Sequence, residues 1–372
     1  MTRSKQGASP AAARAGEPEN RQPVNRQPVN LQSVNRLPVN LALQGGGSHG
    51  AFTWGVLDRL LEEDCFDAEG ISGTSAGAVN GALLAYGLLT GGPGEARDLL
   101  ERLWRRLSKA NAFGPLSPSW MSSMTGNPHL DNHPVYAGFD LMIRMMSPYQ
   151  FNPLGLNPMR EVLRGLIDFD VLRRAAAPRL YVSATNVTEG KLKVFAGAEL
   201  SADALIASAC LPFVFQAVEI DGMPYWDGGY MGNPTIYPLI HDCAARDVII
   251  VQVTPIIRAS VPTTPTAIVD RVNEISFNST YLRELRSIEL INRLIAEGRL
   301  TAEEAGMKPV HLHRIEAEGE MSKLGVSSKL NTDWGFLTTL RDLGRQAASR
   351  WLEDHRSDVG TRSSFEAGRL FV

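Results

Sequence analysis

The sequence predicts an α/β protein in which a mixed, largely parallel sheet lies between layers of helices. Short apolar runs rich in Val, Ile and Leu alternate with longer segments of helical periodicity along most of the chain. Glycine-rich turns follow two of the apolar runs directly, and such turns join strands to helices in parallel sheets. The 372 residues, 44% of them hydrophobic, suffice for a sizeable core.

The expected strands are apolar runs bounded by turn residues. They cover residues 39–44, 71–72, 179–187, 191–195, 216–220, 223–226, 248–253 and 309–315. The expected helices carry apolar residues along one side and cover residues 51–63, 78–86, 95–109, 201–209, 267–297, 301–305 and 333–355. Because strands and helices alternate, we expect helices on both faces of the sheet.

The first 36 residues differ in composition from the rest. Four degenerate pentapeptides rich in Pro, Gln and Asn occupy residues 21–40. This polar tract is too short to stack as a solenoid, so residues 1–36 are expected to form a disordered, mildly basic arm. One domain is expected over residues 37–372, ending in a C-terminal helical extension over residues 263–372.

An irregular insert is expected at residues 111–158, and such a long segment is usually a lid, a binding loop or a flexible connection. Its methionines and aromatic residues suit a plastic surface over a lipid-like ligand, and equally the packing of an irregular insert. They are Trp120, Met121, Met124, Phe139, Met142, Met145, Met146 and Tyr149.

The bulk composition excludes several classes of protein. A net charge of −3 and a pI near 6.2 argue against a nucleic-acid-binding protein. Three widely spaced cysteines argue against a disulfide framework and for a reducing, cytoplasmic compartment. No apolar run reaches the ~18 residues that span a bilayer, so any membrane contact is expected to be peripheral. The oligomeric state is left open.

The pentapeptide Gly73-Thr74-Ser75-Ala76-Gly77 is the first candidate for catalysis. An apolar strand precedes it and a helix of small residues follows, which is the context of a nucleophile elbow. Gly73 and Gly77 leave room for the strained turn on which the serine sits. The helix N-terminus places backbone N–H groups near the serine oxygen. Ser75 is therefore the candidate nucleophile.

Two further glycine-rich turns complete a candidate site for acyl transfer. The first offers consecutive backbone N–H groups to a carbonyl oxygen and consists of Gly45, Gly46 and Gly47, followed by Ser48, His49 and Gly50. The second follows the expected strand 223–226 and consists of Asp227, Gly228 and Gly229. Its glycines let the backbone turn and bring the carboxylate to the serine, so Asp227 is the candidate base.

These three motifs in this order resemble the patatin-like phospholipase family. The helix Ala204–Pro212, Phe215 and the pair Asn233-Pro234 add to the resemblance, which covers about residues 41–253. The resemblance implies a three-layer α/β/α sandwich and a serine hydrolase of lipid or other carboxylic esters. It also implies a Ser75–Asp227 dyad, an acyl-enzyme intermediate, an oxyanion loop at Gly45, Gly46 and Gly47, and no metal or cofactor.

The chain departs from the family in its glycine loop. The family often has Arg or Lys between the glycine triplet and Gly50, where this chain has Ser48 and His49. A neutral His49 removes a fixed positive charge near the oxyanion. A preference for a phosphate head group is therefore open, as is the choice among phospholipid, lysolipid, acylglycerol, simple ester and polyester.

Three other interpretations compete with the dyad. A Ser–His–Asp esterase would need a histidine after Asp227 in the chain. The candidates are His241, His311, His313 and His355, and none of them has a recognisable flanking motif. Residues 45–50 also satisfy a dinucleotide-binding pattern, but the acids Asp67 and Glu69 precede the strand that they should follow. A non-catalytic lipid-binding module is the third alternative.

Overall fold

The computed structural model describes residues 36–110, 142, 145–258 and 260–371. All but the last residue of the expected arm, and most of the expected insert, lie outside the described residues, so both remain predictions. Of the insert's methionines and aromatic residues, Met145, Met146 and Tyr149 are described and exposed. None of the described helices is both long and apolar enough to cross a bilayer. Cys65, Cys210 and Cys243 are free and buried.

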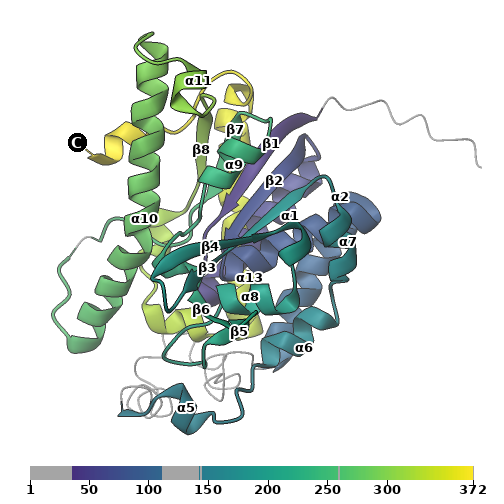
Figure 1. Cartoon of the computed structure of the whole chain (residues 1–372), viewed down its shortest axis with the longest axis vertical. Coiled ribbons are helices and arrows are strands. Elements are labelled where there is room, and N and C mark those ends of the chain that lie inside the picture. The colour runs from purple at the N-terminus through teal and green to yellow at the C-terminus, as the bar shows by residue number, and fades with distance from the viewer. Residues whose placement is uncertain (1–35, 111–141, 143–144, 259, 372) are drawn as a thin grey trace, which may run out of the picture. The chain divides into compact units, whose positions relative to one another are not determined.

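One mixed sheet contains the strands of the described chain (Figure 1). They are β1 (Leu37–Leu43), β2 (Phe66–Thr74), β3 (Arg179–Asn186), β4 (Lys191–Ala196), β5 (Val218–Ile220), β6 (Met223–Asp227), β7 (Asp247–Val251) and β8 (His311–Ile315). β8, β7, β1, β2 and β3 are successive parallel neighbours, whereas β3–β4, β3–β6 and β5–β6 pair antiparallel. The predicted fold class is confirmed.

The helices follow the expected alternation with a few differences. They are α1 (Gly50–Glu63), α2 (Ala76–Ala110), α5 (Pro148–Phe151), α6 (Pro158–Arg164), α7 (Phe169–Arg174), α8 (Ala202–Ser208), α9 (Tyr237–Asp242), α10 (Pro265–Ala296), α11 (Ala302–Ala305), α12 (Glu318–Met321) and α13 (Trp334–His355). The two helices expected at 78–86 and 95–109 are both present, as the two parts of α2 on either side of Gly92, whose backbone is not helical. β2 begins earlier than expected because its polar first half pairs with β1.

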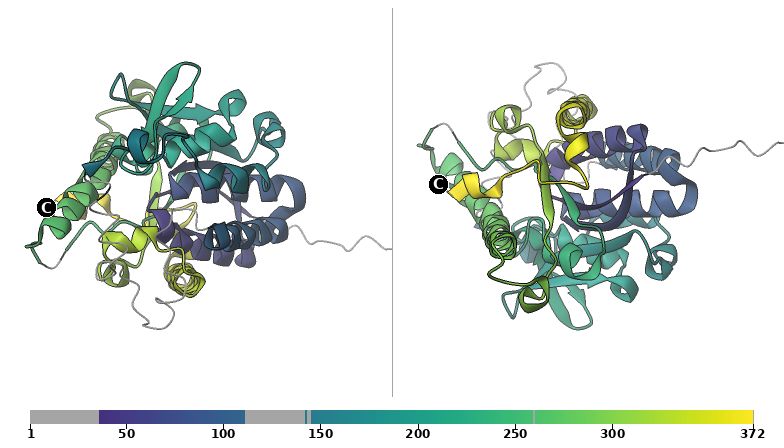
Figure 2. Two further views of the ribbon diagram at one scale, coloured as in Figure 1. Left: turned by 90° about the horizontal axis from the view of Figure 1, so that it is seen from below. Right: turned by 90° about the horizontal axis from the view of Figure 1, so that it is seen from above.

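Alternate residues of the central strands pack against opposite helical layers. Val39, Leu41 and Leu43 of β1 belong to a core shared with α1, α2 and α13, whereas Ala42 belongs to a core shared with α9 and α10. The sheet therefore lies between two layers of helices. Figure 2 shows α13 beside α1, although the two helices are far apart in the sequence.

The strand β3 brings the ends of β2 and β6 together. β4 pairs along one edge of β3, so β2 and β6 share the other edge. Thr74, the last residue of β2, pairs with Ser183, and Asp227, the last residue of β6, pairs with the next residue, Ala184. Because β2 runs parallel and β6 antiparallel to β3, their carboxyl ends meet at this point. Ser75 directly follows Thr74.

Candidate active site

Ser75 lies in the sharp turn between β2 and α2. Its φ of 54° is unusual for a residue other than glycine, and its N–H donates to Ser208 Oγ at 2.9 Å. A Cβ at Gly77 would collide with the Leu43 carbonyl oxygen of β1, and one at Gly73 would lie 2.6 Å from a backbone nitrogen of α2. Glycines on both sides thus let strand and helix approach closely, which is the geometry of a nucleophile elbow.

Asp227 is buried opposite this turn and is held from several directions. Its Oδ1 accepts a hydrogen bond from the Gly229 N–H at 2.8 Å, and its carboxylate lies near enough to the Ser75 hydroxyl for that hydroxyl to lower the pKa of the carboxyl. Its own N–H donates to the Cys210 carbonyl at 2.8 Å, and its carbonyl accepts from Thr185 Oγ1 at 2.8 Å. The Asp227 backbone and Oδ1 are therefore held in place, with the carboxylate near the serine hydroxyl.

The environment of Asp227 moves the pKa of its carboxyl toward neutral pH. Burial raises the pKa of the Asp227 carboxyl to about 6, although the Gly229 N–H, the Ser75 hydroxyl and the positive charge of Lys329 each lower it. At pH 7 the carboxylate is mostly ionised, yet its pKa lies close to the ambient pH. This is the condition under which a general base is most effective.

A buried glutamine, Gln44, joins the end of β1 to the glycine loop. Gln44 Oε1 accepts from two N–H groups just after β7, at 2.8 and 2.9 Å, and its amide nitrogen donates to the Asn233 carbonyl at 3.1 Å. The Asn233 side chain in turn accepts from the Gly45 N–H at 2.7 Å. These bonds hold the start of the loop against the ends of β1 and β7.

The same contacts decide which N–H groups of the loop can serve a ligand. The N–H of Gly45 is bound to Asn233, and that of Gly50 bonds to carbonyls within its own turn. Among the described residues, neither the N–H of Gly46 nor that of Gly47 has a hydrogen-bond partner. Of the glycines in this loop, Gly46 and Gly47 are therefore the two whose N–H groups could bind a ligand.

Gly228 and Gly229 follow Asp227 in the 3-10 helix η3 (Gly228–Tyr230). A Cβ on Gly228 would collide with the Ser183 carbonyl of β3, and one on Gly229 would lie 3.0 Å from Asp227 Oδ1. Neither glycine has a positive φ. At Gly228 the close approach of β3 leaves no room for a side chain, whereas at Gly229 the neighbouring side chains would have to shift slightly.

Ser75, Asp227 and the glycine loop open into one pocket with apolar walls. The apolar lining consists of Ala76, Val79, Leu103, Trp104, Leu107, Met159, Ala209, Leu211, Phe277 and Leu330. Gly229, Asn233 and Lys329 complete the described lining. A site with one reactive end and otherwise apolar walls is suited to an acyl chain.

The histidines considered for a Ser–His–Asp triad lie elsewhere. The described pocket lining contains none of His241, His311, His313 and His355. His311 Nδ1 and His313 Nε2 both contact Asp247 Oδ1, at 3.2 and 3.0 Å, and His355 contacts Asp358. Within the described part of the chain, no histidine is placed to take the proton of Ser75.

Sequence reasoning assigned no role to Ser208, Asn233 or Lys329. Ser208 and Asn233 lie in segments that carry the family resemblance, so these segments could have pointed to them. Lys329 lies in the 3-10 helix η4 (Val326–Leu330), far beyond the motifs. No local signal marks it, because only the packing of η4 against the glycine loop brings it to the pocket.

The fold and this site define an α/β protein with a serine at a strand–turn–helix corner and a buried aspartate in the same pocket. The sequence matches the family described as patatin-like phospholipase over residues 41–240. Because this match covers more than half of the chain, the protein belongs to the patatin-like phospholipase family. No curated protein matches the sequence.

Two solved structures are similar over 86% of this chain. One is VipD from Legionella pneumophila, at 16% identity and a TM-score of 0.37, with 67% of that chain covered. The other is the ExoU–SpcU complex of the type III secretion system of Pseudomonas aeruginosa, at 17% identity and a TM-score of 0.34. The match covers 52% of that second chain, about half of its length.

Proposed function

We propose that this protein is a lipid acyl hydrolase that cleaves carboxylic esters with Ser75 as nucleophile and Asp227 as base. The observation that carries the proposal is that Ser75 and the buried Asp227 carboxylate line the same apolar pocket and lie near enough to interact. Membership of the patatin-like phospholipase family supports a lipid substrate.

In the first half of the reaction, Ser75 Oγ attacks the ester carbonyl while Asp227 takes its proton. The negative charge on the carbonyl oxygen is stabilised by the N–H groups of Gly46 and Gly47, and by that of Ala76 in the first turn of α2, whose N–H groups have no partner inside the helix. Asp227 then returns the proton to the leaving alcohol, and an acyl-Ser75 ester remains.

In the second half, water replaces the alcohol. Asp227 takes a proton from the water as it attacks the acyl-Ser75 carbonyl, and the same N–H groups stabilise the second oxyanion. Collapse of this intermediate releases the carboxylic acid, and the proton returns to Ser75 Oγ. Within this scheme the apolar walls hold the acyl chain, which favours phospholipase A-like or lysophospholipase-like activity over hydrolysis of short esters.

An exposed apolar rim near the pocket supports contact with a lipid surface. The rim consists of Met145, Tyr149, Leu154, Leu156 and Phe213, each more than half exposed. Phe213 lies two residues after Leu211, which lines the pocket. The Gln216 side chain donates to the Asn152 carbonyl at 2.7 Å, which ties the two parts of the rim together. A lipid bilayer would cover these side chains while the substrate enters the pocket.

A fluorophosphonate ester probe tests the proposed nucleophile. We expect it to label Ser75, as located by mass spectrometry, and to abolish hydrolysis of acyl esters. The variant Ser75→Ala should not react, whereas Ser287→Ala, which removes an exposed serine of α10, should react like the wild type. An unlabelled wild-type protein without esterase activity would leave the lipid-binding module as the better description.

A panel of esters that differ in acyl length tests the substrate class. We expect kcat/KM to rise from short to long acyl chains, because the pocket walls are apolar. Flotation with vesicles tests the rim, and Leu154→Asp with Phe213→Asp should abolish co-flotation. Highest turnover on short soluble esters, with no vesicle binding, would point to a simple esterase.

A further inference from the structure

The segment around η4 packs directly onto the glycine loop, although it lies outside the residues that match the family. Gly47 has a φ of 60°, and a Cβ there would lie 2.5 Å from the Lys329 carbonyl oxygen. The His49 ring contacts Ser328, with 2.7 Å between Nε2 and Oγ. His49, which replaces the basic residue frequent in the family, thus holds η4 against the loop and does not line the pocket.

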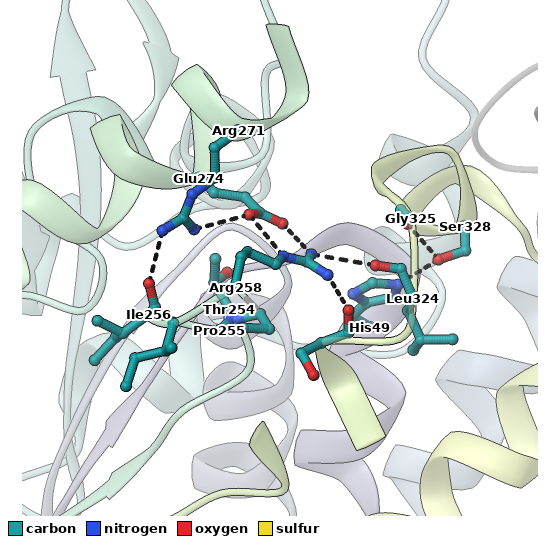
Figure 3. Close-up of polar contacts among 12 residues, drawn as sticks. His49, Thr254, Pro255, Ile256, Arg258, Arg271, Glu274, Leu324, Gly325 and Ser328 are labelled. Atoms are coloured by element: carbon teal, nitrogen blue, oxygen red, sulfur yellow. Dashed lines mark hydrogen bonds and ion pairs between the residues drawn. The ribbon is translucent and has the colours of Figure 1, made fainter. Parts of the chain in front are cut away.

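A buried ionic network holds the chain just before η4 (Figure 3). The Glu274 carboxylate of α10 is 3% exposed and forms ion pairs with both Arg258 and Arg271. The Arg258 guanidinium also donates to the carbonyl oxygens of Ser322 and Leu324, the latter at 3.2 Å. Arg258 therefore ties the segment that leads into η4 to helix α10.

These contacts place Lys329 in the pocket lining, and its ammonium lies near enough to Asp227 for the two charges to interact. Of the described residues that line it, Lys329 is the only cation and Asp227 the only anion. Within the same part of the chain, the Lys329 ammonium forms no ion pair within 4.0 Å. The nearby Glu274 binds two arginines, and the charges of Asp270 and Asp227 reach Lys329 without an ion pair within 4.0 Å among the described residues.

Lys329 is poorly hydrated where it lies. Burial lowers the pKa of its ammonium, while the fields of Glu274, Asp270 and Asp227 act in the opposite direction. An anion bound beside the ammonium would replace part of the lost hydration and favour the charged form. The surroundings are thus suited to an anionic ligand in the same pocket as Ser75.

We propose that Lys329 is a specificity-determining residue that binds a phosphate group carried by the substrate close to the scissile ester. The inference rests on the proposed function, since it assumes that Ser75 attacks an ester in this pocket. In a glycerophospholipid the phosphate and the acyl ester lie on neighbouring or next-but-one carbons, so one small pocket can hold both. Lys329 then supplies from the C-terminal region the positive charge that Ser48 and His49 do not.

The test uses two substrates that differ only in the phosphate. Lysophosphatidate and monoacylglycerol with the same acyl chain are presented in neutral detergent micelles at equal mole fraction. The variants of the full chain are Lys329→Met, Lys329→Arg and the control Lys323→Met, which removes an exposed lysine from the same segment. A third arm adds inorganic phosphate to the monoacylglycerol assay, to separate a lipid phosphate from a free one.

We expect Lys329→Met to lower kcat/KM at least about tenfold on lysophosphatidate and far less on monoacylglycerol. Lys329→Arg should retain most of the preference, and Lys323→Met should behave like the wild type. Equal losses on both substrates, no loss on either, or the same loss in Lys323→Met would overturn the inference. Inorganic phosphate could also inhibit the wild type but not Lys329→Met, while the wild type shows no preference for lysophosphatidate. That result would overturn the inference and indicate a site for free phosphate.

Fluorophosphonate labelling of Ser75 in each variant keeps the two proposals apart. A wild-type protein that is not labelled and hydrolyses neither substrate would contradict the proposed function itself. Labelling of Ser75 in Lys329→Met shows that the variant has folded with an intact elbow. Equal losses in such a labelled variant would contradict only the role of Lys329.

Discussion

The pocket is built by two regions that differ in how their residues are positioned. In the family-matched region, residues 41–240, Ser75 and Asp227 directly follow or end strands that meet on β3. In the later region, Lys329 depends on contacts between side chains far apart in the chain, such as His49 with Ser328 and Arg258 with Glu274. The comparison suggests that the sheet positions the reacting groups, whereas the later region adjusts what they act on.

The largest effect is expected from removal of the proposed base, Asp227, in the first region. Asp227→Asn should lower kcat at least about 1,000-fold, because the amide cannot accept the Ser75 proton. Esterase assays on the purified variant measure this loss. Full activity in Asp227→Asn, combined with inactivity in one of the histidine variants, would replace the dyad by a triad.

The same variant should be more stable than the wild type at pH 8. The pKa of Asp227 is about 6 in the folded chain, above its usual 3.8, so keeping the carboxylate ionised and buried costs stability above pH 6. Asn removes this cost, and we expect a gain of about 1–3 kcal/mol at pH 8 that disappears below pH 4. Urea unfolding at both pH values measures it. A gain of equal size at both would show that the charge is not its cause.

The next largest effect lies where the two regions touch. Gly47→Ala should lower kcat/KM about 100-fold, because the new Cβ meets the Lys329 carbonyl and displaces an oxyanion donor. Gly306→Ala is the matched control, since its φ of 62° is similar but open space surrounds it. Equal effects of both variants on activity would mean that the contact between the loop and η4 is unimportant.

A smaller effect on kcat/KM is expected when the pH of the wild-type protein is lowered. The kcat/KM of the wild type should be nearly constant above pH 7 and fall about tenfold for each pH unit below 6, because protonated Asp227 cannot act as a base. A pH–rate profile on an uncharged ester measures this, since such a substrate does not titrate. An inflection near pH 4 would show that Asp227 is not the group that limits the rate.

The smallest effect on activity is expected from the network behind η4. Arg258→Met should cost about 3 kcal/mol of stability, because it leaves a buried carboxylate with one arginine. It should lower kcat/KM only several-fold, through displacement of η4. Arg299→Met, which breaks an exposed pair with Glu297, should cost less than about 0.5 kcal/mol. Thermal unfolding compares the two, and similar costs would contradict the structural role of Arg258.

Much of the fold could be predicted from the sequence because its elements are locally encoded. Alternating apolar runs marked most strands, and α1, α10 and α13 begin and end within a few residues of the expected positions. The early start of β2 could not be predicted, since Asp67 and Glu69 are polar and only pairing with β1 holds them in a strand. Among the short described helices, α8 and α11 were expected from their segments, whereas α5, α6, α7, α9 and α12 were not, because such short helices carry too few residues for a reliable periodic pattern.

The sequence by itself determined the candidate nucleophile, the candidate base and the family, because Gly-x-Ser-x-Gly, the glycine triplet and Asp-Gly-Gly encode tight turns whose chemistry is local. Only the tertiary structure decided which loop N–H groups are free in the described part of the chain: those of Gly46 and Gly47 are, whereas Asn233 from a distant loop binds that of Gly45. Only the tertiary structure brought Lys329 to the pocket. Such contacts depend on how separate elements pack, and no pattern of neighbouring residues records that packing.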